Sequence, residues 1–303
     1  MKNFSGRTAV ITGAASGFGL EFARLAAQRG MNVVMADVQA DALSRAAAEI
    51  QALGAPVLSV CGNVASSADV QALADQTVQR FGAPHLVFNN AGVATGGLIW
   101  EHSEADWDWV LGVNLRGVAH GVRIFTPLML QAARHDPSFE GHIVNTASMA
   151  GLVCAPNMGV YNVTKHAVVA MSETLYQDLS LVTDQISASV LCPYFVPTGI
   201  SQSHRNRPSD LSTQAPATAS QLIAQASSDK AVSSGKVSAA TVAEFVFAAI
   251  EVRQFYIYSH PQALGPVQTR MEDVLQIRNP SDPFASRPEI GERLRAALRT
   301  PKV

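Results

Sequence analysis

Three residues in the middle of the chain have the types and the spacing of a proton-transfer site. Tyr161 and Lys165 stand four positions apart in the segment YNVTK, and Ser148 precedes the tyrosine by thirteen positions. Residues i and i+4 share one face of a helix, so the lysine ammonium can lie beside the tyrosine hydroxyl. A neighbouring cation favours the phenolate and lowers the tyrosine pKa from its usual value of about 10. The pattern predicts a tyrosine that acts as a general acid and base near neutral pH.

A glycine-rich turn near the N-terminus predicts a dinucleotide site. The segment Thr12–Gly19 reads TGAASGFG, with TGxxxGxG spacing, and it follows the first apolar run of the chain. We expect Gly13 to allow a tight exit from a strand, Gly17 to let the backbone approach a pyrophosphate, and Gly19 to let a helix pack on the sheet. That helix would present its N–H groups to the phosphates. A structural turn would carry the same glycines, so the position between a strand and a helix is what favours a cofactor site.

Asp37 ends the second apolar run, eighteen residues after Gly19. A carboxylate there can accept hydrogen bonds from the adenosine ribose and repels a 2′-phosphate. Val38 follows it and Ser16 lies in the glycine turn, so neither position offers a cation for NADP. The pattern therefore predicts NAD as the cofactor. A role for Asp37 as a mere helix cap is disfavoured, because the helical periodicity starts later, near Ala40.

These residues must be positioned by elements that alternate along the chain. Apolar, β-branched runs predict seven strands, at Arg7–Thr12, Asn32–Ala36, Val57–Val60, His85–Asn89, His142–Ala147, Ser187–Leu191 and Gln254–Ser259. Helical periodicity between them predicts helices at Gly17–Arg29, Ala40–Leu53, Ala68–Phe81, Glu104–Gln131, Gly159–Leu181 and near Ala240–Arg253. Such alternation predicts an α/β fold, a Rossmann-like, doubly wound parallel sheet with helices on both faces. We expect one catalytic domain over residues 1–260.

Two segments depart from this alternation. Residues 199–237 are rich in Ser, Ala, Gln, Thr and Pro, and connections of this length are uncommon inside compact domains. Because the segment begins just after a cofactor-side strand end, a substrate lid is favoured over an inert loop. Residues 261–303 form an extension punctuated by prolines. We expect it to pack on the domain or at a subunit interface.

Composition excludes several functional classes. The 303 residues are 48% hydrophobic and 15% charged, with a net charge of −2, which gives no footprint for nucleic acid. No secretory leader is recognisable at the N-terminus, and the apolar stretch Val242–Ile250 is too short to span a bilayer. Cys61, Cys154 and Cys192 form no metal pattern and no disulfide framework, and the histidines show no metal-ligand spacing. We expect a cytoplasmic, reduced protein without a metal.

With these residues in place, the chain resembles the short-chain dehydrogenase/reductase family over about residues 5–260. The motifs that carry this resemblance are the TGxxxGxG turn, Asp37, NNAG at 89–92, Asn114 in VNLRG, Ser148 in IVNTAS, YxxxK at 161–165 and the segment from Pro193 to Thr198. The HIVNTAS strand, NRP at 206–208 and the YIYSHP stretch look like bacterial dehydrogenases that oxidise the benzylic alcohols of lignin-type aryl ethers.

The resemblance implies the reversible oxidation of an alcohol by NAD⁺. Tyr161 would be the general acid and base, and Ser148 would hydrogen-bond the reacting oxygen. Lys165 would hold the nicotinamide ribose and lower the tyrosine pKa, and Asn114 would position a water that links Lys165 to solvent. The Val196 backbone and the Thr198 hydroxyl would meet the carboxamide. The cofactor residues expected are Gly13, Ser16, Gly17, Phe18, Gly19, Asp37, Val38, Asn63, Val64, Asn90, Ala91, Gly92, Tyr161, Lys165, Pro193, Val196 and Thr198.

Two positions depart from the family pattern. Tyr194 follows Pro193 where a glycine is usual, and Asn63 stands where an aspartate usually faces the adenine. Asn63 still offers a side-chain carbonyl. A bulky aromatic beside the nicotinamide narrows the substrate pocket and offers stacking to an aromatic substrate.

The expected substrate pocket is mostly apolar. Its residues are Ser148, Met149, Val153, Cys154, Tyr194 and Phe195. We therefore expect a neutral, hydrophobic secondary alcohol or ketone, aromatic or alicyclic. Arg205 and Arg207, on the lid, are the cations that could reach a substrate carboxylate. A nucleophilic role for Cys154 is disfavoured against a pocket-wall role, because no histidine stands beside it in sequence. His166 is expected on the outer face of its helix.

Family members usually pair through the helix that Trp107 and Trp109 begin and the helix that bears Tyr161, so a homodimer or homotetramer is expected. Two other functions stay open. One is an NADPH-dependent carbonyl reductase, and the other is a dinucleotide sensor that kept the fold without the chemistry.

Overall fold

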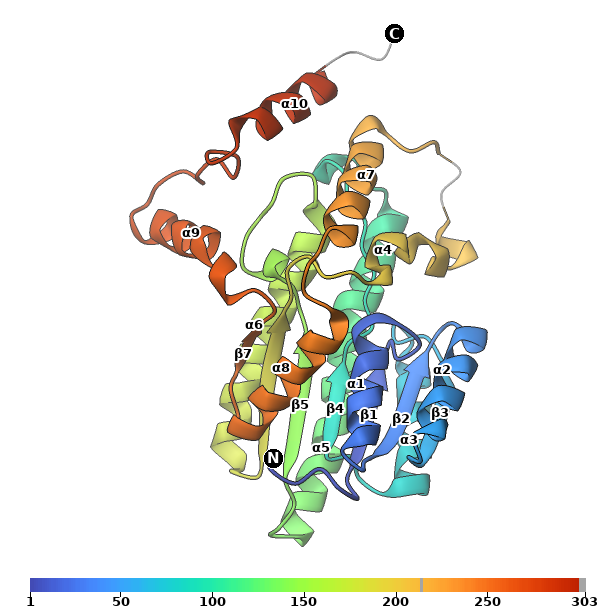
Figure 1. The fold of residues 1–303 in the computed structure, drawn as a ribbon. Coiled ribbons are helices and arrows are strands. Elements are labelled where there is room, and N and C mark those ends of the chain that lie inside the picture. The colour runs from blue at the N-terminus through green and yellow to red at the C-terminus, as the bar shows by residue number, and fades with distance from the viewer. Residues whose placement is uncertain (213–214, 300–303) are drawn as a thin grey trace.

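A seven-stranded parallel sheet forms the centre of the molecule (Figure 1). The computed structural model describes residues 1–212 and 215–299. The strand order β3-β2-β1-β4-β5-β6-β7 reverses between β1 and β4, which confirms the doubly wound sheet. The strands are β1 (Thr8–Thr12), β2 (Asn32–Asp37), β3 (Val57–Cys61), β4 (Leu86–Asn89), β5 (Gly141–Thr146), β6 (Ile186–Cys192) and β7 (Tyr256–Tyr258).

Helices cover both faces of this sheet. One face packs against α1 (Gly17–Gln28), α2 (Ala40–Ala52) and α8 (Ala239–Val252). The other face packs against α3 (Ser67–Phe81), α5 (Gly117–His135) and α6 (Gly159–Val182). Successive side chains of β1 serve the two faces in turn, because a strand alternates its side chains: Ala9 and Ile11 join the first cluster and Val10 the second. This two-sided core fixes the strand ends from which the site is built.

The helix predicted over Glu104–Gln131 is confirmed as a helical run from Glu104 to His135, but a π turn that the prediction did not contain interrupts its regular α geometry. It divides into α4 (Glu104–Leu111), a π-helical turn η2 (Gly112–Arg116) and α5. The N–H of Gly117 donates to the Gly112 carbonyl, five residues back. A side chain at Gly117 would stand 2.8 Å from Val64, so glycine allows the close packing at this turn. Single π turns inside helices are frequent at functional sites.

The segment 199–237, predicted as a lid with little periodicity, contains regular structure. It holds the 3₁₀ turns η4 (Gly199–Asn206) and η5 (Ser209–Leu211) and the helix α7 (Ala219–Ser233). A capping box starts α7: the Thr218 hydroxyl accepts from the Gln221 N–H, and the Gln221 side chain accepts from the Thr218 N–H. The T-x-x-Q spacing is a recognised helix-start signal, so this helix could have been found from the sequence.

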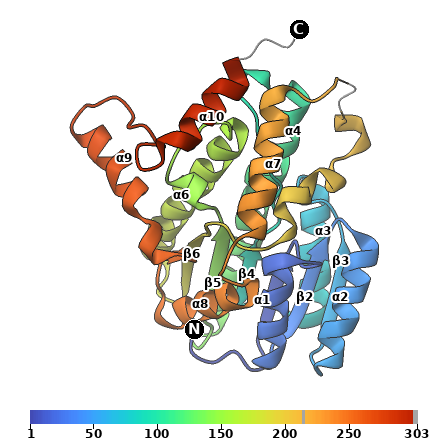
Figure 2. The same ribbon diagram turned by 45° about the horizontal axis from the view of Figure 1, so that its top comes forward.

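Residues 261–299 form an arm that leaves the body after β7 (Figures 1 and 2). The arm consists of the turn η6 (Pro261–Ala263), α9 (Gly265–Leu275) and α10 (Pro288–Arg299). In Figure 2, α10 lies over the same end of the molecule as α7, and these two helices are in contact. We call residues 261–299 the C-terminal arm.

Several features are absent from the described parts of the chain. No helix within residues 1–212 and 215–299 has the length and apolarity needed to cross a membrane. Within the same residues, no three His, Cys, Asp or Glu side chains gather in a way that could hold a metal ion. The three cysteines are free thiols.

Candidate functional site

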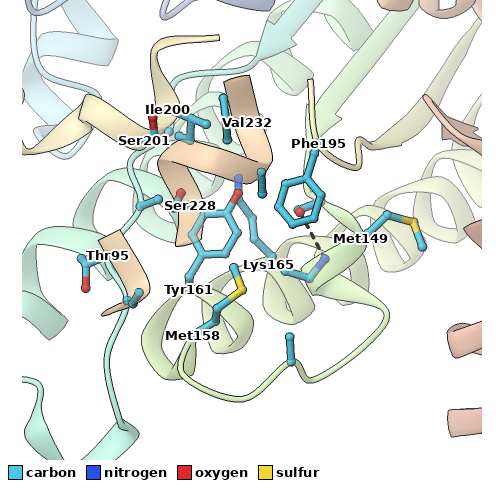
Figure 3. Close-up of a pocket in the computed structure, with 18 of the residues that line it drawn as sticks. Thr95, Met149, Met158, Tyr161, Lys165, Phe195, Ile200, Ser201, Ser228 and Val232 are labelled. Carbon is cyan, nitrogen blue, oxygen red and sulfur yellow. Dashed lines mark hydrogen bonds between the residues drawn. The ribbon is translucent and has the colours of Figure 1, made fainter. Parts of the chain in front are cut away.

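The carboxyl ends of the central strands open into one large cavity, of about 2000 Å³ (Figure 3). Of the predicted site residues, all except Gly19 and Asn114 line this cavity. They come from the turns after β1, β2, β3, β4, β5 and β6 and from the first turns of α6. A parallel sheet places such ends along one edge, which is where ligands bind in open α/β sheets. The fold therefore brings residues that are far apart in sequence into one site.

The predicted proton-transfer residues meet in the cavity. Ser148 lies just after β5, where its hydroxyl accepts from the Ala150 N–H at 3.1 Å. The same hydroxyl donates to the Pro193 carbonyl at 3.4 Å, and it lies near enough to Tyr161, in the first turn of α6, to lower the tyrosine pKa. Lys165 lies one turn later, with its ammonium 5.6 Å from the centre of the tyrosine ring. The i, i+4 spacing thus places both side chains on one helix face, as predicted.

The expected lowering of the Tyr161 pKa is not found in this structure. Burial raises the pKa of Tyr161 to about 12, and the hydrogen bond with Ser148 offsets only part of that rise. The ammonium of Lys165 is directed to the Thr146 carbonyl, to which it donates at 2.9 Å. Burial also lowers the pKa of Lys165 to about 8, since Lys165 is 3% exposed. Desolvation is therefore the largest influence on the pKa of both groups.

Asn114 lies behind the cavity wall in the π turn. It is fully buried, and its amide is held by the backbone of Val93: Oδ1 accepts from the N–H at 2.8 Å and Nδ2 donates to the carbonyl at 2.9 Å. Nδ2 also lies 3.2 Å from the Thr164 hydroxyl. A side chain added at Gly92 would stand 3.5 Å from Asn114 and 3.6 Å from the Lys165 ammonium, so both lie on the same side of that glycine. The water relay through Asn114 stays a prediction.

The glycine turn has the geometry that a pyrophosphate needs. Gly13 and Gly17 adopt positive φ angles of 66° and 55°, where other residues are strained. A side chain on Gly19 would stand 2.1 Å from the Gly13 carbonyl, so Gly19 allows α1 to pack on the turn. Ser16 is the N-cap of α1, yet its side chain makes no capping hydrogen bond and no acidic residue stands in the first turn. The helix N-terminus is therefore suited to an anion.

Asp37 stands at the end of β2 with its carboxylate fixed by the backbone. Oδ2 accepts from the Ala15 N–H and Oδ1 from the Gln39 N–H, each at 3.0 Å. Both Asp37 and the following Val38, which is 47% exposed, line the cavity. A carboxylate held rigidly beside the glycine turn fits a ribose diol and disfavours a phosphate at the same place.

Two asparagines at the end of β4 join three strands by hydrogen bonds. Asn90 Nδ2 donates to the Thr12 carbonyl at 3.0 Å, and its Oδ1 accepts from the Thr146 hydroxyl at 3.2 Å. Asn89 donates to Asn145 at 2.8 Å. These amides brace β1, β4 and β5 against one another. After β3, the side-chain Oδ1 of Asn63 accepts from the Ala65 N–H at 3.0 Å.

Aromatic and sulfur-containing side chains form the expected substrate wall. Tyr194 is 47% exposed, and its ring packs against Phe195 at 4.5 Å and His260 at 5.8 Å between ring centres. Cys154 lines the cavity as predicted, and a histidine distant in sequence lies beside it: its sulfur is 3.7 Å from His166 Nε2. His166 Nδ1 in turn lies 2.9 Å from the Asn162 carbonyl. Asn162 lies one helical turn before His166, and the loop before α6 brings Cys154 beside the His166 ring.

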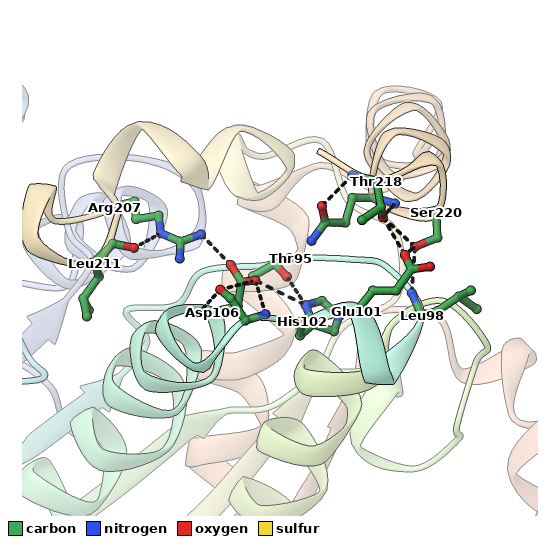
Figure 4. Close-up of polar contacts among 11 residues, drawn as sticks. Thr95, Leu98, Glu101, His102, Asp106, Arg207, Leu211, Thr218 and Ser220 are labelled. Atoms are coloured by element: carbon green, nitrogen blue, oxygen red, sulfur yellow. Dashed lines mark hydrogen bonds and ion pairs between the residues drawn. The ribbon is translucent and has the colours of Figure 1, made fainter. Parts of the chain in front are cut away.

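Two polar clusters hold the segment 199–237 against the start of α4 and the 3₁₀ turn that precedes it (Figure 4). In the first, the Arg207 guanidinium donates to Asp106 at 2.5 Å and to the Leu211 carbonyl at 2.6 Å. In the second, Glu101 accepts from the Thr218 and Ser220 hydroxyls. Burial acts to raise the pKa of Asp106, but the hydrogen bonds from Arg207 and Ser103 outweigh it and lower this pKa. The Arg207 guanidinium therefore already has its hydrogen-bond partners within the protein, and Arg207 does not line the cavity.

Sequence reasoning missed several residues of the cavity wall. Thr95 and Met158 line it from the loops before η1 (Ile99–Glu101) and α6, and Ser228 and Val232 line it from α7 (Figure 3). The C-terminal arm contributes residues as well, which the prolines of that segment gave no reason to expect. Arg205, the second arginine expected to reach a substrate, lines the cavity but donates to the Gly199 and Gln202 carbonyls.

Comparison with known proteins gives consistent matches. Residues 7–209 match the family model described as short chain dehydrogenase. The chain is 34% identical to a CLA biosynthesis dehydrogenase/reductase of Lactiplantibacillus plantarum, over 91% of this chain and 95% of that protein. It is 30% identical to a C alpha-dehydrogenase of a Sphingobium species, over 96% and 93% respectively. A short chain dehydrogenase/reductase from Burkholderia phymatum, solved in complex with NAD, has a TM-score of 0.91 at 50% identity, covering 94% of this chain and all of that one.

Proposed function

Since the chain belongs to the short-chain dehydrogenase family, it is an oxidoreductase, and we propose that it transfers a hydride between NAD and a hydrophobic secondary alcohol or ketone. The observation that carries this proposal is that Ser148 and Tyr161 line the same cavity, into which the glycine turn also opens. Lys165 lies one helical turn away. The site thus combines a proton carrier, a hydrogen-bond donor and a cation.

The side chains have separable tasks in this reaction. A bound nicotinamide supplies the carbon that accepts or donates the hydride. Tyr161 takes the hydroxyl proton when an alcohol is oxidised and returns it when a ketone is reduced. Ser148 hydrogen-bonds the reacting oxygen and stabilises the charge that develops on it. Because burial favours the neutral phenol, the positive charge of Lys165 is needed to bring Tyr161 toward the phenolate for oxidation.

The preference for NAD over NADP rests on Asp37. Its carboxylate is held by two backbone N–H groups at the point where an adenosine ribose would lie, and Val38 beside it carries no charge. A 2′-phosphate at this place would meet a fixed negative charge. The NAD complex of the Burkholderia phymatum protein supports the same choice.

The test is NADH formation at 340 nm with NAD⁺ or NADP⁺ and a panel of benzylic, alicyclic and aliphatic secondary alcohols. We expect turnover of bulky hydrophobic alcohols with NAD⁺. The Tyr161→Phe variant should bind NAD⁺ as the wild type does and lose nearly all turnover. Turnover that prefers NADP⁺ would instead indicate the NADPH-dependent reductase. A chain that binds NAD⁺ but turns over no alcohol, with Tyr161→Phe behaving like the wild type, would indicate the dinucleotide sensor.

A further inference from the structure

The cavity extends beyond the residues expected to hold the cofactor and the reacting alcohol. It measures about 2000 Å³ in all. Its lining continues beyond Tyr161 to α7 and the C-terminal arm. We call the part lined by α7 and the C-terminal arm the outer chamber. Room remains there for a substrate much longer than a single ring.

Both walls of the outer chamber carry apolar side chains. The α7 wall presents Ile223 and Val232, and the C-terminal arm presents Phe284, Ile290 and Leu294. Contact between α7 and α10 brings these walls together, and Figure 2 shows both helices over the same end of the molecule. Phe284 is held against α10, because a side chain on Gly291 would stand only 3.0 Å from its ring. An extended hydrocarbon chain would find apolar contacts on both sides.

The outer chamber also carries an excess of positive charge. Its lining includes the cations Lys230, Arg270, Arg278, Arg287 and Arg293, and the acids Asp273 and Asp282. Asp273 is occupied by Arg278 at 3.0 Å, and Asp282 lies 4.0 Å from Arg295, which does not line the cavity.

Two of the arginines are left for a ligand. Within residues 1–212 and 215–299, the side chains of Arg270 and Arg287 form no ion pair and no hydrogen bond. Arg270 lies on α9 and is half-buried, and Arg287 immediately precedes α10. A guanidinium binds anionic oxygen groups with two parallel hydrogen bonds.

We propose that the substrate is an elongated, amphipathic alcohol whose far end is anionic. Its hydroxyl-bearing carbon lies at Tyr161, its apolar chain occupies the outer chamber, and its terminal anionic oxygens bind Arg270 and Arg287. The position of the hydroxyl at Tyr161 rests on the proposed function. The anion site does not, because it is inferred only from the residues that line the outer chamber. It revises the expectation of a neutral substrate, which considered only the residues next to the nicotinamide.

Binding can be tested without turnover, by titration calorimetry on the full chain with and without saturating NAD⁺. The probes are decanoate, decyl phosphate and methyl decanoate, which share an apolar chain and differ in the terminal group. We expect at least one anionic probe to bind, and the double variant Arg270→Gln/Arg287→Gln to weaken it about tenfold or more. Methyl decanoate should bind equally to both proteins. The matched control is Arg295→Gln, an arginine of the same arm that does not line the cavity.

The outcomes separate the two proposals. Preference for decanoate identifies a carboxylate, and preference for decyl phosphate identifies a phosphate. The inference is overturned if neither anion binds more tightly than the ester, or if the double variant binds like Arg295→Gln while unfolding at the wild-type temperature. With 2-decanol and 9-hydroxydecanoate as substrates, the double variant should raise KM for the acid only and leave kcat unchanged. If both are inert although an anionic probe binds, the proposed function has failed and the anion site has not.

Discussion

At the scale of single residues, buried Lys165 couples the chemistry of the site to the stability of the fold. Its pKa falls from the usual 10.5 to about 8 in the folded protein. Below pH 8 both states are protonated, so the folded state carries the full cost of a buried charge. Between pH 8 and 10.5 only the unfolded state holds the proton, and stability gains with rising pH.

The Lys165→Met variant should reveal this cost. At pH 7 the variant should be more stable than the wild type, because it buries no charge. This gain in the free energy of unfolding should be smaller at pH 10 than at pH 7 by on the order of 1–3 kcal/mol. Urea denaturation of both proteins across this pH range measures the difference. The exposed Lys236→Met serves as the control and should show no such pH dependence. A constant difference between Lys165→Met and the wild type would contradict the prediction.

A second residue-scale prediction concerns the cofactor. Replacing Asp37 by alanine removes the fixed charge that would repel a 2′-phosphate. We expect the Kd for NADP⁺ to fall and that for NAD⁺ to rise, so that the ratio between them changes by about tenfold or more. Fluorescence titration with each nucleotide measures both constants. The Asp41→Ala variant, in the first turn of α2, removes an acid near the same end of the sheet and should leave the ratio unchanged.

Most site residues were predictable from sequence because strand ends and glycine turns fix where they lie. The direction in which the Tyr161 pKa shifts was not predictable. Spacing tells that Lys165 shares a helix face with Tyr161, but not that its ammonium bonds to the Thr146 carbonyl or how deeply the phenol is buried. The contact between Cys154 and His166 was missed for a related reason, because it depends on the path of the loop before α6.

At the scale of elements, the pair Arg207 and Asp106 should control how firmly the lid segment is held. Their side chains are 16% and 7% exposed, and the guanidinium also lies 5.3 Å from the centre of the Trp109 ring. Breaking a buried ion pair by removing one partner leaves an unpaired charge and costs about 3 kcal/mol or more. We expect Arg207→Gln to open residues 199–212 locally, without unfolding the sheet.

Hydrogen exchange followed by mass spectrometry measures this opening. Peptides from residues 199–212 should exchange faster in Arg207→Gln, and KM for the alcohol should rise more than kcat falls, because the catalytic residues lie outside the segment. Arg45→Gln, on the far side of the sheet in α2, is the matched control. Protection factors equal to those of the wild type would show that the pair does not hold the lid segment.

Elements with strong apolar periodicity were predicted to within a few residues, whereas two of the irregular ones were not. The π turn at Gly112–Arg116 adds a residue to one helical turn, and periodicity alone reads through it. The helix α7 has polar residues on most of its surface, so it has no apolar stripe from which a helix could be predicted. Its capping box was the available signal.

At the scale of the whole molecule, the C-terminal arm carries apolar side chains that are exposed to solvent in the single chain. Val274, Leu275 and Ile277 are 64%, 81% and 95% exposed, and Ile277 has a positive φ of 55°, which is unusual for a β-branched residue. By contrast Trp109, expected at an interface, is 3% exposed and packs inside the protein. Contiguous exposed apolar groups mark interaction sites.

We therefore expect a second copy of the chain to cover the tip of α9, in line with the homo-oligomer anticipated from sequence. Light scattering after gel filtration should give a mass of at least twice the 32.1 kDa of one chain. The double variant Leu275→Ser/Ile277→Ser should shift the mass toward a single chain, because it removes the apolar contact but not the fold. Leu53→Ser, at the exposed end of α2, is the control. A wild-type chain that elutes as a monomer would show that no such interface exists. A double variant with an unchanged oligomeric mass would show that the interface lies elsewhere on the chain. If the shift occurs and also raises KM for a long substrate, then assembly and the outer chamber depend on the same arm.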